Sequence, residues 1–224
     1  MKKMKYLKGY FFVLCAVIGI IGAGCKSIDT PKERLPEIKQ ELTQHTQVEI
    51  VNQNQPLFSE EELSLENGTW QTFSNLDQLN RVGEANALLH KSMMPLKERE
   101  RLYIQPTGWK QKKMKNGDYL YNRCHLIGYQ LTGENNNPKN LMTGTRSFNT
   151  PAMVEYENKV AEYLRNTGNH VRYRVTPDFR RNELVARGVR IEAQSIEDDR
   201  LSFHVYVHNV QEGYTIDYLT GRTK

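Results

Sequence analysis

Apolar and polar residues alternate along residues 118–127, a pattern that predicts a β-strand. Tyr119, Tyr121 and His125 fall on one face of this strand, because successive side chains of a strand point to opposite sides. A polar loop follows, and a second short strand is expected at residues 140–143.

The hydrophobic period changes to that of a helix at residues 150–168. Thr150 is a suitable N-cap, Pro151 takes the first helical position, and Gly168 lies just past the last turn. The expected apolar face carries Met153, Tyr156, Val160, Ala161 and Leu164.

The remaining pattern is mostly that of strands, at residues 170–176, 183–193 and 201–210. Residues 74–77 resemble a capping box that opens a short helix, and residues 85–89 are apolar enough for either a helix or a strand. One clear helix among mostly antiparallel strands predicts an α+β domain. In the last strand one face is expected to carry Phe203, Val205 and Val207.

The N-terminus has the layout of an export signal. Residues 1–24 contain four lysines and no acid, followed by an apolar run at residues 10–23. The residues before Cys25 resemble a bacterial lipoprotein signal, in which Cys25 would be lipidated. The alternative, which the sequence favours equally, is ordinary signal cleavage nearby and a freely secreted protein. In either case the rest of the chain is expected outside the cytoplasm, secreted or anchored to the outer face of the membrane.

Charge divides the exported part in two. The whole chain carries +5, and its composition is too apolar for a disordered chain and too polar for a multi-span membrane protein. We expect an acidic tether at residues 25–66, with nine acids and four bases and a possible edge strand at residues 48–51. The domain at residues 67–224 then has 23 bases and 17 acids, or +6. This excess suggests a negatively charged partner.

A constellation of chemically useful side chains surrounds the 118–127 strand. His125 is a candidate general base, Asn149 lies at the start of the helix, and Arg123 suits a phosphate group. An amide oxygen is a hard ligand for Mg²⁺, which keeps most of its waters. These groups suffice for metal-assisted phosphodiester hydrolysis, although the spacing alone is a weak signal.

Residues 70–221 resemble the bacterial DNA/RNA non-specific endonucleases, of the streptococcal extracellular DNase and DNA-entry nuclease type. The matching motifs, in chain order, lie at residues 94–99, 105–109, 121–129, 137–141, 146–149, 156–160, 173–175, 207–211 and 217–221.

The resemblance implies a ββα-metal (His-Me finger) core on a mostly antiparallel sheet. It implies that His125 is the general base, that Asn149 binds Mg²⁺, with Mn²⁺ able to substitute, and that Asn140 is a further active-site asparagine. Glu157 matches a glutamate that orients metal-bound water, and Arg123 fits a phosphate-facing role. The implied reaction is endonucleolytic cleavage of DNA, or of RNA as well, leaving 5′-phosphates.

One departure concerns the family signature Asp-Arg-Gly-His, which here reads Asn122-Arg123-Cys124-His125. Asn122 lacks the carboxylate that the family's aspartate has, so we expect a different rate of cleavage and a different metal preference. The catalytic histidine of the signature is kept as His125. Cys124 cannot easily act as a thiol nucleophile with His125, because adjacent strand residues point to opposite faces; we expect a buried side chain. The alternative function is a DNA-binding surface lipoprotein of the same fold with weak or no catalysis.

Basic residues also precede the active-site strand. Lys110, Lys112, Lys113 and Lys115 are expected to contact the phosphate backbone without sequence preference, together with Arg146.

Other polar side chains have weaker claims to a role. Arg172 and Arg174 could extend this basic track or be simple surface residues. His204 and His208 lie four residues apart on one strand face, but with no third ligand in the sequence we expect exposed histidines rather than a zinc site.

Overall fold

The computed structural model describes residues 47–224. The expected signal sequence at residues 1–24, the lipidation site at Cys25 and the first part of the tether lie outside the described residues. Within the described part, no helix is long and apolar enough to cross a membrane. The elements run in the order β1 (Val48–Ile50), η1 (Asn52–Asn54), η2 (Glu61–Leu63), β2 (Trp70–Phe73), β3 (Ala85–Leu89), η3 (Lys91–Met93), β4 (Tyr121–His125), α1 (Tyr129–Thr132), β5 (Leu141–Thr145), η4 (Phe148–Met153), α2 (Val154–Thr167), β6 (Val171–Pro177), β7 (Gly188–Ser195) and β8 (Ser202–His208).

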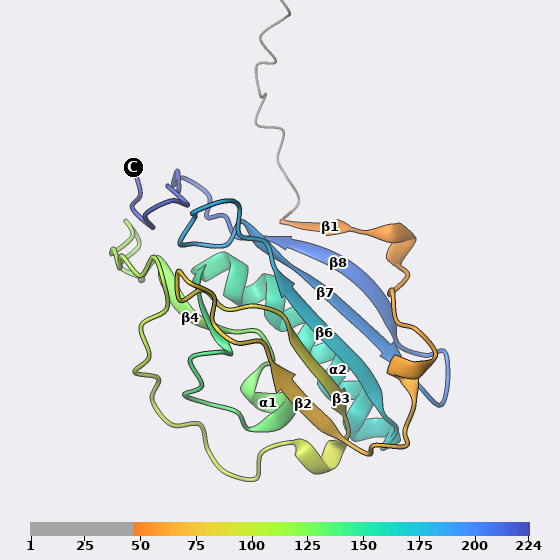
Figure 1. Cartoon of the computed structure of the whole chain (residues 1–224). Helices are drawn as coiled ribbons and strands as arrows, with labels where there is room; N and C mark the ends of the chain where they lie inside the picture. Colours follow the sequence, from red (N-terminus) through yellow and green to blue (C-terminus); the bar gives the residue numbers. More distant parts are fainter. Residues whose placement is uncertain (1–46) are drawn as a thin grey trace, which may run out of the picture. The chain divides into compact units, whose positions relative to one another are not determined.

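Six strands form an antiparallel sheet in the order β1-β8-β7-β6-β3-β2. The helix α2 lies behind this sheet in Figure 1 and shares one hydrophobic core with it. The alternation expected in the last strand is confirmed, because one face of β8 is buried in that core. The core joins Val160, Ala161 and Leu164 of α2 to Phe203, Val205 and Val207 of β8.

A separate antiparallel pair, β4 with β5, carries the candidate chemistry. Asn209, which is fully buried, fastens this pair to the main sheet. Its side-chain Oδ1 accepts from the Thr145 N–H at 2.8 Å, and its Nδ2 donates to the carbonyls of Thr143 and Ala186 at 3.1 and 2.9 Å. The chain order β4, β5, η4 and α2 confirms the expected ββα unit and the α+β fold class.

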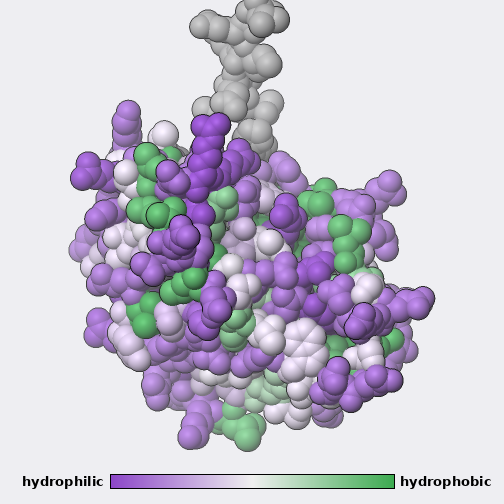
Figure 2. Space-filling model, viewed as in Figure 1, coloured by the Kyte–Doolittle hydropathy of each residue, from purple (hydrophilic) through white to green (hydrophobic). Residues whose placement is uncertain are grey.

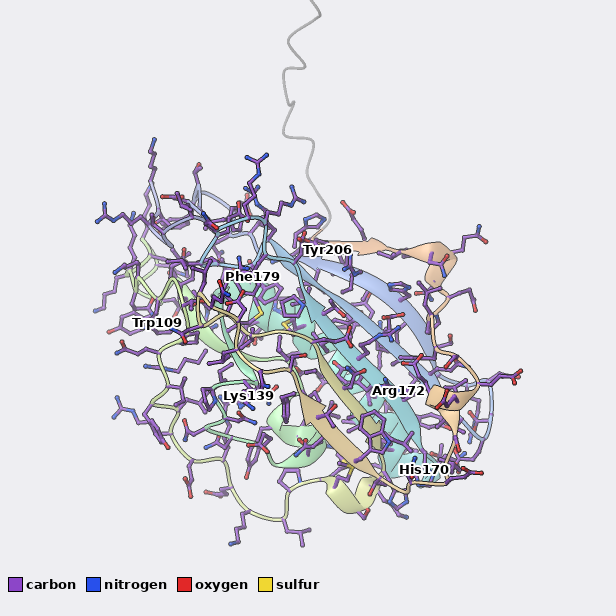
Figure 3. The ribbon with its side chains drawn as sticks, viewed as in Figure 1. Trp109, Lys139, His170, Arg172, Phe179 and Tyr206 are labelled. Atoms are coloured by element: carbon purple, nitrogen blue, oxygen red, sulfur yellow. The ribbon has the colours of Figure 1, made fainter. Side chains whose placement is uncertain are left out.

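The segment expected as the end of the tether belongs to the folded domain, which begins by residue 47 rather than at residue 67. The expected edge strand is confirmed as β1, which pairs with β8. Glu62 accepts hydrogen bonds from Arg172 and Arg174, each at 3.1 Å, and Phe58 lies against both guanidinium groups. Arg172, labelled on the sheet in Figure 3, is therefore buried. Both arginines are paired with acidic side chains, so neither offers an unpaired charge to the basic track.

Two expectations for helices have different outcomes. The prediction that a short helix opens at residues 74–77 is wrong. Asp77 instead accepts hydrogen bonds from the backbone N–H groups of Leu79 and Arg81 in a turn. The helix expected after Thr150 is confirmed as α2, which ends at Gly168 in the left-handed conformation. Its expected start is not: the N-cap of α2 is Met153, while Thr150, extended at φ −141°, and Pro151 lie in η4.

The face seen in Figure 2 is largely hydrophilic, with small separated hydrophobic patches. Ile50 and Leu57 are among the exposed apolar side chains, at 72% and 62% exposure.

Candidate active site

The ββα unit brings four predicted residues, Arg123, His125, Asn149 and Glu157, to one cavity of about 290 Å³, called here the catalytic cavity. His125 ends β4, Asn149 lies in η4, and Glu157 lies in the first turn of α2. The cavity is lined by Arg99, Arg123, His125, Gly128, Tyr129, Gln130, Asn149, Val154 and Glu157.

His125 is held as a neutral base. The residue is 6% exposed, and its Nε2 lies 2.9 Å from the Asn135 carbonyl oxygen. A carbonyl can only accept, so Nε2 carries the proton and Nδ1 keeps its lone pair. Burial lowers the pKa of His125 to about 4; the Arg99 charge acts in the same direction, and the bond to Asn135 opposes it. At neutral pH the imidazole can therefore accept a proton at Nδ1.

Asn149 offers one free amide oxygen. Its Nδ2 donates to Thr150 Oγ1 at 3.0 Å, while its Oδ1 accepts no hydrogen bond from the described part of the chain. Residues 47–224 contain no group of three His, Cys, Asp or Glu side chains that could enclose a metal ion. An amide oxygen near a single carboxylate fits Mg²⁺, which needs few protein ligands, better than it fits Zn²⁺.

Glu157 forms the inner wall of the catalytic cavity. Its side chain is nearly buried, and burial raises its pKa to about 7, against the opposing effects of a Gln130 hydrogen bond and the Arg99 charge. Gly128 packs directly on the carboxylate, and a Cβ at that position would overlap it. The absence of a side chain at residue 128 therefore makes room for Glu157.

Asn140 lies outside the catalytic cavity, whereas the resemblance implied a further active-site asparagine. It is fully buried and does not line the catalytic cavity. Its Oδ1 accepts from the Ile127 N–H at 2.9 Å and its Nδ2 donates to the Ile127 carbonyl at 3.0 Å. Both ends of the amide are thus used to hold the chain just after His125, which makes Asn140 a positioning residue.

Two arginines border the catalytic cavity. Arg123 donates from Nε to the Ile104 carbonyl, and its guanidinium lies 4.6 Å from the Trp109 ring centroid. Arg99 has no salt bridge among residues 47–224, and its charge acts on both His125 and Glu157. No role for Arg99 was predicted; the only signal was its place in the matched 94–99 motif.

A larger groove of about 780 Å³, the active-site groove, continues from the catalytic cavity. Arg99, Arg123 and Asn149 line both hollows, so the two are contiguous. Arg146 lines this groove and pairs with Asp118 at 3.1 Å. The aromatic side chains of the groove are Trp109, Tyr119 and Tyr121.

The predicted lysines do not line the active-site groove. Lys110 is exposed, while Lys112, Lys113 and Lys115 line a separate hollow of about 660 Å³. The structure therefore divides the basic stretch between two surfaces.

The altered signature residues face different surroundings, although the Cys124 Sγ lies 3.6 Å from the Asn122 carbonyl oxygen. Asn122 is at the edge of the active-site groove, whereas Cys124 is a free cysteine in the hydrophobic core with its pKa raised by burial. The expectation that Cys124 is buried is confirmed.

The two β8 histidines do not form a metal site. His204 is buried rather than exposed, with Nδ1 3.0 Å from the Gln55 carbonyl, because residues 51–57 cover that face. His208 Nε2 lies 2.8 Å from Glu49 Oε1.

The relatives that comparison with known proteins finds are nucleases. A deoxyribonuclease of Streptococcus dysgalactiae subsp. equisimilis is 31% identical over 115 residues, which cover 49% of this chain and only 35% of that protein. NucA of Streptococcus agalactiae, solved without metal and with magnesium bound, is 28% identical, with TM-scores of 0.70 and 0.71 over 79% of this chain and 86% of that one. The Sda1 nuclease, solved with zinc, shares the fold at 24% identity and a TM-score of 0.65, over 80% of this chain and 96% of that one.

The sequence profile of the DNA/RNA non-specific endonucleases matches residues 63–197, a span that includes β4, β5 and α2. The chain therefore belongs to the DNA/RNA non-specific endonuclease family.

Proposed function

We propose that this protein is an exported endonuclease that hydrolyses phosphodiester bonds of DNA, and of RNA as a second substrate. The observation that carries the proposal is the shared catalytic cavity. His125, with Nδ1 unprotonated, lies there beside the free Oδ1 of Asn149 and the carboxylate of Glu157.

His125 supplies the base. Its Nδ1 takes a proton from a water molecule, which attacks the phosphorus in line with the leaving 3′ oxygen. The hydrogen bond from Nε2–H to the Asn135 carbonyl keeps the ring oriented and stabilises the imidazolium once the proton has transferred. Asn140 supports this geometry because its amide group hydrogen-bonds both the N–H and the carbonyl of Ile127, just after His125 in the chain.

Asn149 is the residue that would hold the metal ion. Mg²⁺ bound there, or Mn²⁺ in its place, would neutralise charge on the phosphate and on the departing oxygen. Glu157 lines the same cavity, where its carboxylate would accept hydrogen bonds from a water molecule and orient it.

Arginines hold the substrate by its phosphates. Arg123 is pre-oriented by Ile104 and Trp109, and Arg99 and Arg146 line the same groove. Phosphates are common to every sequence, so such contacts give affinity without base preference. This chemistry supports a broad substrate range and 5′-phosphate products.

Export rests on the sequence of residues 1–25, with its lysines, apolar run and Cys25. We propose a secreted or lipid-anchored enzyme on the outer side of the membrane. Labelling with a radioactive fatty acid would separate the two forms, since only a lipidated Cys25 incorporates it and Cys25→Ser abolishes it.

Plasmid nicking tests the proposed chemistry. The purified protein should nick supercoiled DNA with Mg²⁺ and should not do so with a chelator. His125→Ala should lower kcat by a factor of about 10² to 10⁴, the usual contribution of a general base. Asn149→Ala should lower activity and raise the Mg²⁺ concentration that is needed.

Matched controls are His90→Ala and Asn166→Ala, which lie outside both hollows. Full activity of His125→Ala or Asn149→Ala would contradict the mechanism. Retention of DNA in a shift assay with no cleavage in either metal would favour the alternative of a non-catalytic DNA-binding protein.

A further inference from the structure

A second hollow of about 660 Å³, the lysine groove, lies outside the active site and is lined by Lys112, Lys113, Lys115, Lys224 and Tyr214. We propose that the lysine groove is a second nucleic-acid-binding subsite, which holds the phosphate backbone of the substrate beyond the active-site groove. This inference rests on the proposed function, because it extends the path of the same substrate.

The charge of the lysine groove is unbalanced. None of its four lysine side chains forms a salt bridge within residues 47–224, and Glu212 is the one acidic side chain in its lining. Unpaired ammonium groups attract phosphates and release their counterions on binding.

A hollow lined by Arg180, Arg187 and Arg190, also in the described part of the chain, differs in this respect. There Arg180 and Arg187 are paired with Asp178 and Glu183, so much of its positive charge is already neutralised. Outside the active-site groove, the lysine groove is thus a hollow whose positive side chains are free of salt bridges within residues 47–224.

A folded hairpin carries three of the lysines, Lys112, Lys113 and Lys115, so these are presented at fixed positions. Lys113 pairs with Tyr119 across the hairpin, and the Met114 N–H donates to the Asp118 carbonyl at 2.8 Å. Met114, Leu120 and Tyr121 form a small hydrophobic cluster beneath it.

The C-terminal segment completes the lysine groove. The Lys115 N–H donates to Tyr214 Oη at 3.2 Å, and Tyr121 Oη donates to the Gly221 carbonyl at 2.9 Å. The Lys224 N–H donates to the Thr215 carbonyl at 3.1 Å. In Figure 1 this segment and the hairpin lie side by side at one edge of the molecule.

The hairpin separates the two grooves. Trp109, on the active-site side and labelled in Figure 3, and Tyr214, on the other side, pack against the same small cluster. The Lys113 Nζ lies 5.9 Å from the ring centroid of Tyr119, which lines the active-site groove. A strand leaving the active-site groove can thus cross the hairpin and enter the lysine groove.

The lining suits a nucleic-acid backbone of any sequence. Ammonium groups meet phosphates, and the partly exposed Tyr214 ring offers a face for a base. The Lys112 Nζ already lies 5.5 Å from that ring centroid, so cation and ring act together.

Salt-dependent binding tests the proposal directly. A labelled duplex of about 40 base pairs is titrated with protein in chelator at several salt concentrations, using the triple variant Lys112→Gln, Lys115→Gln and Lys224→Gln. Each lost phosphate contact removes about 0.9 from the slope of log Kd against log salt, so the slope should fall by about 2 to 3. Binding at about 0.1 M salt should weaken about tenfold.

Cleavage of long and short substrates gives a second readout. The ratio of kcat/KM for the long duplex to that for one of about 8 base pairs should fall at least about fivefold in the triple variant, because the short duplex is expected not to span both grooves. The matched control is Lys91→Gln, Lys159→Gln and Arg165→Gln, which removes the same charge elsewhere and should leave the ratio unchanged. Arginine at residues 112, 115 and 224 should restore the slope.

A triple glutamine variant that matches the control in both slope and ratio would overturn the proposal. The failure of the proposed function would look different. In that case His125→Ala would still cleave normally, while the binding slopes of the triple variant and the control would still differ.

Discussion

His125 and Glu157 face one cavity, and burial shifts their pKa values in opposite directions because it disfavours the charged form of each. The pKa of His125 falls from 6.5 to about 4, and that of Glu157 rises from 4.5 to about 7. Each shift corresponds to about 3 kcal/mol of unfolding free energy.

The two shifts should nearly cancel in the wild-type protein. His125 contributes stability that is present above pH 6.5 and is lost as the pH falls to about 4, because the unfolded state takes up the proton first. Glu157 contributes stability that is present below pH 4.5 and is lost as the pH rises to about 7.

Single variants should expose each contribution. Glu157→Gln should lose stability relative to wild type as the pH falls from 6.5 to about 4, and His125→Gln should lose it as the pH rises from 4.5 to about 7. Urea unfolding in chelator across this range measures both. Parallel pH profiles for the two variants would show that neither group has its pKa shifted.

The close contact between Gly128 and the Glu157 carboxylate leads to a second prediction about single residues. Its φ of −59° suits any residue, so Gly128→Ala should act only through the overlap of its Cβ with the Glu157 carboxylate. We expect a loss of about 1–3 kcal/mol in unfolding free energy and lower activity. In a Glu157→Ala background the same change should cost almost nothing, and an equal cost in both backgrounds would rule out this contact.

The residues that carry a recognisable reactive group were predicted from the sequence. The motif identified His125 and Asn149, and the structure places both in the catalytic cavity. The sequence did not predict the roles of Arg99 and Gly128, because these depend on packing between segments far apart in the chain. Asn140 shows the same limit: its residue type suggested chemistry, whereas its contacts show support of Ile127.

At the scale of elements, Asn209 joins the β4–β5 pair to the main sheet. Asn209→Ala should leave the Thr145 N–H and the Thr143 and Ala186 carbonyls without their partner inside the protein. We expect a loss of about 3 kcal/mol in urea unfolding, since each buried unpaired group is costly. The exposed control Asn166→Ala should change stability by less than about 0.5 kcal/mol. Equal stability of the two variants would mean that Asn209 does not hold the pair.

Periodicity predicted the long elements well and the short ones poorly. The α2 helix and the buried face of β8 follow from repeated apolar positions. The helix expected at residues 74–77 failed because a residue that caps a helix can equally stabilise a turn, as Asp77 does. The packing of residues 51–63 against the sheet depends on pairs such as Glu62 with Arg172, which local sequence does not reveal.

At the scale of the whole molecule, the fold should not depend on metal. Only Asn149 is expected to hold Mg²⁺, and the described residues contain no enclosing ligand cluster. Chelation should abolish cleavage. The unfolding free energy in chelator should be at most about 1.4 kcal/mol lower than in Mg²⁺ at ten times its Kd, which is the stabilisation that one bound ion gives at that concentration. Loss of the folded state on chelation would point to a structural metal instead.

The measurement that tests the central claim most directly is chemical rescue of His125→Gly in plasmid cleavage. We predict that the variant is inactive with Mg²⁺ alone and that added imidazole restores cleavage in proportion to its neutral fraction, because the missing group is a base. Asn149→Ala should gain nothing from imidazole. Cleavage by His125→Gly at the wild-type rate without imidazole would contradict the assignment of His125 as the general base.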